Sequence, residues 1–322
     1  MADQSEYEVR NLSELEDSCN SFLNDLQQST NGFKHYIEFV DSVEKAKLAC
    51  DQLRSFKELA FDCEGVRLGK GGKLTLIQLM AKDDKIFIFD VLALGESLFQ
   101  NTGLREILES KEIWKVMFDC RDDSDSLWEE YKVKLSNVLD MQLLEYIVRP
   151  GLREPNVQSL GNTVKLGNTV NSFNAIGISD FASLKTNVGK IIRRCPTVWK
   201  CRPLHEGLER YAALHVVILH LVKESLTKKL PLQGVQLERL EVASERYASV
   251  RRDCEKPELV YIRNNGLPSY IIPNMSGGKL KAFPREDSKC FGCKRMFCAS
   301  FVVNNKCKDC KRNLKRKHNQ IA

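Results

Sequence analysis

The sequence predicts an α/β protein with a mixed β-sheet flanked by helices, followed by a small cysteine-rich module near the C-terminus. Strand-like apolar runs alternate with segments of helical spacing up to about residue 150, which is the pattern of an α/β domain with a mixed sheet. Three of those runs follow one another through short turns. Five of the twelve cysteines crowd between residues 290 and 310, so that end needs a separate explanation.

The elements of the first half follow from local signals. A short strand is expected at residues 35–40, and Asp41 or Ser42 then caps a helix. Apolar positions of that helix include Val43, Ala46, Leu48 and Leu53. The next elements are expected in this order: strands at 58–65, 74–80 and 86–91, a helix over 94–110, a strand at 113–118, a helix with Leu127, Trp128 and Tyr131, a strand at 137–140, and a helix over 141–148 that Asp140 caps.

The rest of the chain has a looser pattern. Between residues 150 and 200, Gly, Asn, Ser and Thr are frequent, so only short helices are expected there. A long helix is predicted over 205–229, and Pro231 stops it. A charged helical segment is expected within 232–252, whereas residues 1–34 are predicted to be a polar, loosely held extension.

The composition argues against a membrane or secreted protein. None of the apolar runs approaches the roughly 18 residues that a membrane span needs, and residues 1–20 are polar and acidic rather than signal-like. We therefore expect an intracellular protein of the nucleus or cytoplasm, with no membrane partner. Disulfides among the seven scattered cysteines are not expected in a reducing compartment.

Two carboxylates stand two residues apart on the first of the three consecutive strands. Because side chains alternate along a strand, Asp62 and Glu64 project from the same face. Carboxylate oxygens suit Mg²⁺ or Mn²⁺, so the pair indicates a metal site. The alternative is that both acids lie at a solvated strand end and bind nothing.

Further candidate residues lie on other elements. Asp123 follows the strand at 113–118, and Tyr211 and His215 are four apart on the long helix, so they share a helical face. Metal-dependent phosphodiester cleavage places two cations about 3.5–4 Å apart and needs several carboxylates to hold them. Each signal alone is weak, but their order and setting together are specific.

Three stretches carry a family resemblance. They are Phe61-Asp62-Cys63-Glu64-Gly65; Lys115-Val116-Met117-Phe118-Asp119-Cys120-Arg121-Asp122-Asp123 with the downstream Leu139-Asp140; and Trp199…Arg202-Pro203-Leu204 followed by Tyr211-Ala212-Ala213-Leu214-His215. In these motifs the chain resembles the DEDD-type 3′–5′ exonucleases, in the branch with ribonuclease D, the Werner exonuclease domain and the Egalitarian-like exonuclease-domain proteins. The resemblance covers residues 35–228 and implies a ribonuclease H-like sheet.

The resemblance also implies roles for individual residues. Asp62, Glu64 and Asp123 would bind Mg²⁺ or Mn²⁺ in a two-metal site, and Tyr211 would position the attacking water. Asp119 and Asp125 are close enough to Asp123 to remain alternatives to it. The tripeptide Asp119-Cys120-Arg121 resembles the Egalitarian-like branch most closely. This resemblance favours RNA over DNA as the nucleic acid.

One position departs from the family pattern, because His215 stands where the family has its last acid. A neutral imidazole is a poor ligand for Mg²⁺ but an acceptable one for Mn²⁺ or Zn²⁺. Three outcomes are open: an enzyme with a histidine ligand, an enzyme with one impaired metal site, or a domain that lost catalysis and kept an RNA-binding groove. A histidine that only packs in the helix is the plain alternative.

The cysteine-rich end predicts a structural zinc site. Cys290-Phe291-Gly292-Cys293 and Cys307-Lys308-Asp309-Cys310 are two Cys-x-x-Cys pairs separated by 13 residues. Tetrahedral Zn²⁺ takes four thiolates from two such pairs. Cys298 is a spare that could replace one of the four. Phe297 and Phe301, which stand among basic residues, either stack on nucleic-acid bases or fill the small zinc core.

The net charge of +6 is concentrated at this end. Residues 285–322 hold 11 Lys and Arg against three acids, a net charge of +8, and the remainder sums to −2. An anionic partner, most simply nucleic acid, would explain the tail, and a solvated tail without a partner is the alternative. Residues 311–318 fit a nuclear-import patch, an RNA clamp or both. Protein partners of the chain are left open. The expected organisation is a polar N-terminal extension (1–34), an exonuclease-like domain (35–228), a linker or helical extension (229–287), a zinc module (288–311) and a basic tail (312–322).

Overall fold

A computed structural model describes most of the chain. The described residues are 10–11, 17–33, 35–149, 157–166, 181–252, 267 and 271–273, together with the backbone of short strands between residues 275 and 307. Six strands form one mixed sheet in the order β2-β5-β4-β3-β6-β7. The strands are β2 (Ile37–Val40), β3 (Glu58–Val66), β4 (Lys73–Met80), β5 (Ile86–Asp90), β6 (Trp114–Met117) and β7 (Val138–Asp140).

The strand directions confirm the predicted mixed sheet. β4 runs antiparallel to both of its neighbours, β3 and β5, because short turns connect these three strands. The remaining pairs, β2 with β5, β3 with β6 and β6 with β7, are parallel. Nearly every residue of β4 and all of β5 are buried, as expected for central strands that helices cover on both faces.

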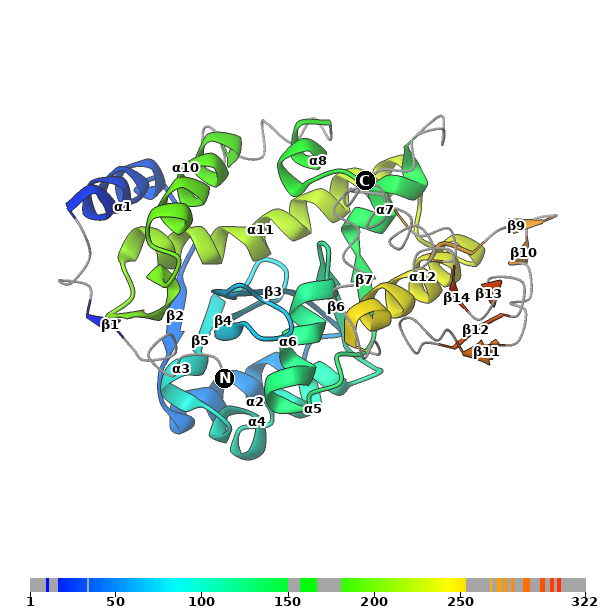
Figure 1. The fold of residues 1–322 in the computed structure, drawn as a ribbon, viewed down its shortest axis with the longest axis horizontal. Helices are drawn as coiled ribbons and strands as arrows, with labels where there is room; N and C mark the ends of the chain where they lie inside the picture. Colours follow the sequence, from blue (N-terminus) through cyan, green and yellow to red (C-terminus); the bar gives the residue numbers. More distant parts are fainter. Residues whose placement is uncertain are drawn as a thin grey trace, which may run out of the picture.

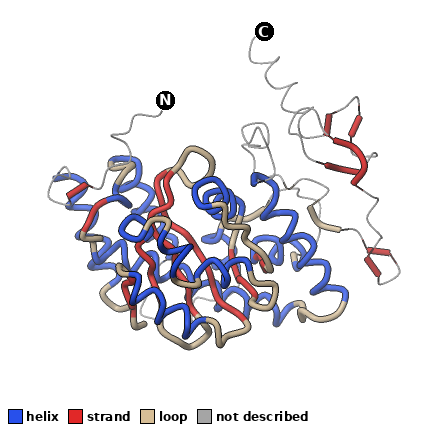
Figure 2. The backbone as a smooth tube through the Cα atoms, turned by 90° about the horizontal axis from the view of Figure 1, so that it is seen from below, coloured by secondary structure: helices blue, strands red, loops and turns tan. Residues whose placement is uncertain are grey.

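Helices lie on both sides of the sheet (Figure 2). On one side α11 (Glu206–Lys229) crosses β3, β4 and β5, and α10 (Phe181–Arg194) lies beside it (Figure 1). On the other side α2 (Val43–Leu53), α4 (Ser97–Asn101) and α5 (Leu104–Glu109) pack on one another. The sheet with its two helical layers positions the candidate site under α11.

Most of the predicted boundaries are confirmed. Ser42 caps α2 by accepting a hydrogen bond from the backbone N–H of Lys45, and Asp140 caps α7 (Met141–Val148) through the N–H groups of Gln142 and Leu143. The placement of Leu48 on the apolar face of α2 was wrong, because its side chain is 62% exposed.

The single helix predicted over 94–110 is wrong. Three short helices take its place: α3 (Val91–Leu94), α4 and α5. Gly95 and Gly103 separate them with φ values of 54° and 88°, a left-handed conformation that breaks a right-handed helix. The apolar spacing across the three pieces nevertheless buries Leu98, Leu104, Ile107 and Leu108.

The N-terminal segment is not loosely held throughout. Residues 17–30 form α1 (Asp17–Thr30), which packs on α10 and α11 through the fully buried Cys19, Leu23 and Leu26. Helices α1 and α11 approach closely at Gly207 of α11, where an added Cβ would lie 2.8 Å from the backbone nitrogen of Gln27 in α1. The amphipathic patch of the sequence therefore marks a docked helix.

Two further helices extend the domain. α10 has 14 residues and is longer than the short helices expected between 150 and 200, whereas α8 (Leu160–Leu166) fits that expectation. α12 (Val235–Arg252) confirms the predicted helical segment and packs on α6 (Arg121–Tyr131) and β7. The Tyr247 hydroxyl donates to Oε1 of Gln142 at 2.6 Å, which ties α12 to α7.

The C-terminal region is described only as backbone of short paired strands. β11 (Glu286–Lys289) pairs with β12 (Met296–Cys298), and β13 (Val302–Val303) pairs with β14 (Lys306–Cys307). Of the four predicted zinc ligands, Cys290, Cys293 and Cys310 lie outside the described residues, as does the basic tail, and the Cys307 side chain is not described either. Among the described helices, none is long and apolar enough to cross a membrane.

Candidate active site

Asp62 and Glu64 lie on the central strand β3, beneath α11. Asp62 is paired with Gln78 of β4, and the register shifts between Glu64 and Gly65, where the antiparallel ladder is irregular. Both side chains are partly buried, 20% and 14% exposed. They point toward one common group on α11, as the alternation along a strand predicts.

That group is His215. Its Nδ1 atom lies 2.9 Å from Oδ2 of Asp62 and 3.2 Å from Oε1 of Glu64, so one ring nitrogen spans the two carboxylates. Tyr211 lies one turn earlier, with its ring centroid 4.6 Å from that of His215. The helical spacing of four residues therefore brings both side chains to the same place over β3.

Asp123 lies close to this group but has a different environment. It stands in the first turn of α6, which starts just after β6, and it is buried. Burial raises the pKa of the nearby Cys63 thiol on β3, and the charge of Asp123 adds to that rise. Burial raises the pKa of the Asp123 carboxyl well above its usual range, and the negative charges of Asp62, Asp119 and Glu64 raise it further.

The two alternatives to Asp123 are engaged elsewhere. Asp119 accepts two hydrogen bonds from the guanidinium of Arg121, at 2.5 and 2.8 Å. Asp125 accepts a hydrogen bond from the backbone N–H of Lys70 at 2.8 Å, and so helps to hold the glycine-rich loop between β3 and β4. Asp140, at the end of β7, accepts from the N–H of Cys120 at 2.9 Å and braces the turn that carries these acids.

The electrostatics of His215 follow from its neighbours. Burial lowers the pKa of the imidazole, but the carboxylates of Asp62 and Glu64 outweigh burial and raise it to about 9. Burial also raises the pKa of the Glu64 carboxyl, whereas its hydrogen bond to His215 lowers it. The two acids therefore favour the protonated ring, which would donate toward both of them in a charge-assisted arrangement.

Three candidate ligands for a divalent cation come together under α11. Ligand atoms of Asp62, Glu64 and His215 all lie within 4.8 Å of one another, which is compatible with a shared ion. Two carboxylates with one imidazole suit Mn²⁺ or Zn²⁺ better than Mg²⁺. Asp123 does not belong to this cluster of described residues.

Sequence reasoning missed two neighbours of the site on α10. Phe181 meets the edge of the His215 ring with centroids 6.0 Å apart, and the positive charge of Lys185 acts on Glu64 to lower its pKa, against the larger effect of burial. Both residues come from the region where only short helices were expected. Their local sequence carries no signal for this position, because α10 reaches the site only through tertiary packing.

The turn before α11 is anchored to the sheet. Arg202 makes a bidentate ion pair with Asp90 at the end of β5, with Nε–Oδ2 at 2.6 Å and Nη2–Oδ1 at 2.7 Å. The Arg202–Pro203 peptide bond is cis. Trp199 is buried and its ring lies 6.5 Å from that of Tyr211, so this turn helps to set where α11 enters the site.

The sheet order, the acids on β3 and α6, and the tyrosine of α11 together define a nuclease-like α/β domain. The chain belongs to the 3′–5′ exonuclease family, whose pattern matches residues 37–231. The resemblance seen in the three motifs is therefore confirmed at the level of the family.

Individual relatives and structures agree with this placement. The human piRNA biogenesis protein EXD1 is 30% identical over 209 residues, which is 62% of this chain but 38% of that protein. The corresponding Bombyx mori protein is 27% identical over 201 residues, covering 62% of this chain and 59% of that one. The chain thus spans less than two thirds of these relatives.

Solved structures share the fold at low sequence identity. The crystal structure of Trypanosoma brucei RNase D in complex with RNA U12 is 21% identical, has a TM-score of 0.56, and covers 87% of this chain and 98% of that one. Escherichia coli RNase D is 20% identical with a TM-score of 0.51, and covers 70% of this chain and 52% of that one. These likenesses support the ribonuclease H-like fold.

Proposed function

We propose that this protein binds single-stranded RNA through its exonuclease fold and that His215 disables two-metal phosphodiester hydrolysis with Mg²⁺. One observation carries the proposal: Nδ1 of His215 lies within hydrogen-bonding distance of both Asp62 and Glu64. The same two carboxylates would have to bind the metal, so the histidine competes with the cation for their oxygens.

The other ring nitrogen supports this interpretation. A histidine that ligates a metal usually donates its second N–H to a carboxylate, carbonyl or water, which fixes the ring orientation. Within the described part of the chain, Nε2 of His215 is buried and has no hydrogen-bond partner. The ring is therefore oriented by the acids and by the rings of Tyr211 and Phe181, not by an outer group that would prepare it as a ligand.

A second candidate function rests on a separate observation. The ligand atoms of Asp62, Glu64 and His215 lie within 4.8 Å of one another, a set that could hold one Mn²⁺. In that case the protein is a 3′–5′ exonuclease that requires Mn²⁺, with the three residues as ligands and Tyr211 placed beside them.

RNA is the favoured nucleic acid in both cases. A piRNA biogenesis protein is among the relatives, and an RNase D bound to RNA is among the structures with this fold. Both are properties of those proteins, and they support RNA here by analogy of the domain. The basic C-terminal tail, with its charge of +8 over residues 285–322, supplies an additional attraction for phosphate.

A degradation and binding assay separates the two candidates. Single-stranded RNA and DNA labelled at the 5′ end are incubated with Mg²⁺ or Mn²⁺, and binding is measured on the same samples in EDTA. We expect the wild-type protein to bind RNA and to leave it intact in Mg²⁺. His215→Asp should shorten RNA from the 3′ end at least ~100-fold faster, which corresponds to about 2.7 kcal/mol in the barrier.

The double variant Asp62→Asn/His215→Asp is the matched control and should lose the gained activity. Shortening by the wild-type protein in Mg²⁺ as fast as by His215→Asp would contradict the proposal. Cleavage by the wild-type protein in Mn²⁺ alone, abolished in His215→Ala, would establish the second candidate.

A further inference from the structure

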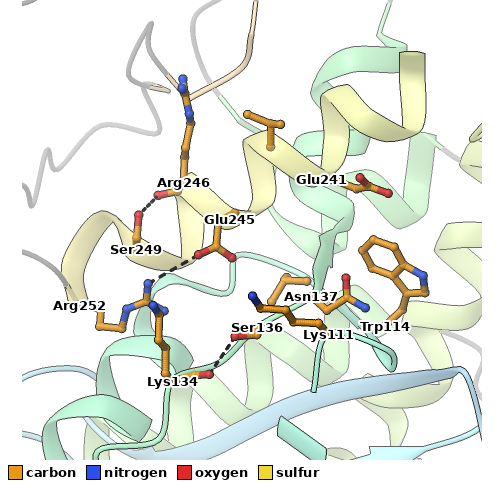
Figure 3. A pocket seen from close by; sticks show the side chains of 12 residues that line it. Lys111, Trp114, Lys134, Ser136, Asn137, Glu241, Glu245, Arg246, Ser249 and Arg252 are labelled. Atoms are coloured by element: carbon orange, nitrogen blue, oxygen red, sulfur yellow. Dashed lines mark hydrogen bonds and ion pairs between the residues drawn. The ribbon is translucent and has the colours of Figure 1, made fainter. Parts of the chain in front are cut away.

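A separate pocket of about 680 Å³ lies between α12 and the beginning of strands β6 and β7 (Figure 3). Its volume is in the range of small-molecule sites. The side chains that matter for its chemistry are Lys111, Trp114, Lys134, Asn137, Glu241 and Arg252.

The pocket is at the opposite end of these strands from the acids. Trp114 is the first residue of β6, and the far end of β6 leads to the turn that carries Asp123. Val138, another lining residue, is the first of β7, whose last residue is Asp140. A ligand here would therefore not compete for the carboxylates under α11.

The pocket has an excess of positive charge. Lys111, Lys134, Arg246 and Arg252 line it, against Glu241 and Glu245. Arg252 is held in place: its side chain is 4% exposed, Nη1 donates to the carbonyl of Leu135 at 3.3 Å, and Nη2 lies 3.9 Å from Glu245.

Lys111 and Lys134 are exposed at the rim of the pocket, and neither ammonium forms an ion pair within the described residues. Two positive charges are therefore available to an anionic ligand.

Two more side chains give the pocket an aromatic and a hydrogen-bonding component. Trp114 is half-buried and packs its indole against the core while lining the pocket. Asn137 has a φ of 54°, and its Nδ2 is a buried donor without a partner among the described residues. A buried amide that lacks an acceptor is unfavourable, and a ligand acceptor would satisfy it. In Figure 3 both side chains lie beside each other below α12.

We propose that this pocket binds a nucleotide, with the base against Trp114 and the phosphate at Lys111 and Lys134. An aromatic base can stack on an indole ring and present acceptors to Asn137, while ammonium groups pair with phosphate. The nucleotide comes either from solution as a monophosphate or from a strand of RNA. This inference is independent of whether the carboxylate site cleaves RNA, because it rests on different residues.

The test uses the full-length protein and two matched charge-reversal variants. Lys111→Glu/Lys134→Glu changes the pocket, whereas Lys47→Glu/Lys82→Glu makes the same charge change at exposed lysines elsewhere. Affinities for adenosine and uridine 5′-monophosphate and for a 12-nucleotide RNA are measured by calorimetry. We expect the pocket variant to bind at least about tenfold more weakly than the control variant.

The two sources of the nucleotide give different results. A loss of monophosphate affinity confined to the pocket variant supports binding of a free nucleotide. A loss seen only with the 12-nucleotide RNA supports a nucleotide of an RNA strand. Equal affinities of the two variants for all ligands, or pocket-dependent binding of an acidic peptide in place of nucleotides, would overturn the proposal.

A second readout locates the ligand without relying on a charge change. 4-Thiouridine 5′-monophosphate, and the same base within the RNA, are cross-linked by light and the modified peptides are mapped by mass spectrometry. The expected cross-links fall on peptides that contain Trp114 or Lys134, and Trp114→Leu reduces them. Cross-links confined to peptides with Asp62 or His215 would show that nucleotides bind only at the carboxylate site, against the proposal.

Discussion

The Nδ1 atom of His215 lies 2.9 Å from Oδ2 of Asp62, although the two residues are 153 positions apart in the chain. This contact places a basic side chain at two acids that are candidate metal ligands. It also links the helix α11 directly to the central strand β3. A cation bound by Asp62 would have to compete with this contact.

The first prediction concerns metal affinity. His215→Asp should bind Mn²⁺ roughly tenfold or more tightly than the wild-type protein. The new carboxylate adds a charged oxygen ligand, and the imidazole that contacted Asp62 and Glu64 is gone. Calorimetric titration of both proteins with Mn²⁺ measures the difference. Adding Asp62→Asn to the variant should remove the gain. Wild-type affinity equal to that of His215→Asp would show that the imidazole serves as a full ligand.

The second prediction concerns the ion pair between Arg202 and Asp90. The Asp90 side chain is 3% exposed, so Arg202→Gln would leave its charge buried without its cation. We expect a loss of roughly 3 kcal/mol in the free energy of unfolding, measured with urea. The matched control is Arg54→Gln, whose partner Asp51 is 66% exposed, with an expected loss below about 1 kcal/mol. Similar losses in the two variants would refute the anchoring role.

The third prediction concerns the contact between α1 and α11. Gly207→Ala should destabilise the protein by about 1–3 kcal/mol, because the added methyl group would meet the backbone of Gln27. Gly161→Ala in α8 is the control, since an added Cβ there meets nothing within 4 Å. That change should be neutral or stabilising by up to about 1 kcal/mol. Thermal unfolding of both variants decides whether α1 is docked in solution.

The fourth prediction is a pH dependence that arises from Lys115 on β6. Burial lowers the pKa of its ammonium from 10.5 to about 7, although Nζ donates to the carbonyls of Ser110 and Ile113 at 2.7 Å. Between these two pKa values the unfolded chain holds a proton that the folded protein releases. The folded state should therefore gain stability as pH rises from 7 toward 10.5.

Lys115→Met provides the reference for this effect, because other groups titrate in both proteins. Urea unfolding at pH 6.5 and 9.5 should show the wild-type protein gaining stability relative to the variant at the higher pH. If the stability difference between the two proteins is the same at both pH values, the three hydrogen bonds from Lys115 to backbone carbonyls keep its ammonium protonated at pH 9.5 as well as at pH 6.5.

The fifth prediction concerns the two Cys-x-x-Cys pairs. Elemental analysis of the purified protein should find about one zinc per chain, and Cys290→Ser or Cys310→Ser should reduce it. Cys298→Ser is the matched control and should retain the metal if Cys298 is the spare thiol. Absence of zinc from the full-length protein would exclude the metal site. Loss of zinc in Cys298→Ser would show that Cys298 is one of the four ligands in place of another cysteine.

Much of the fold could be predicted because its signals are local. Alternation of side chains placed Asp62 and Glu64 on one face of a strand, and helical spacing paired Tyr211 with His215. Caps such as Ser42 and Asp140 were readable because a side chain bonds to its own next turn. The helix predicted over 94–110 failed where Gly95 and Gly103 adopt positive φ, which apolar periodicity does not report.

Other features exist only through tertiary packing. Asp119 and Asp125 could not be separated from Asp123 by spacing, because Arg121 and the backbone of Lys70 engage them in the folded protein. The docking of α1, the approach of Phe181 and the pocket beside Trp114 join segments that are distant in the chain.

The sequence by itself determined the family, the order of strands and helices along the chain, and the residue types offered to the site, since these follow from motifs and short-range periodicity. Only the tertiary structure decided which side chains meet. It brought His215 between Asp62 and Glu64. The physical reason is that His215 and Asp62, which are 153 positions apart in the sequence, meet only when α11 packs across β3. Short-range sequence patterns do not specify a contact between residues so far apart in the chain.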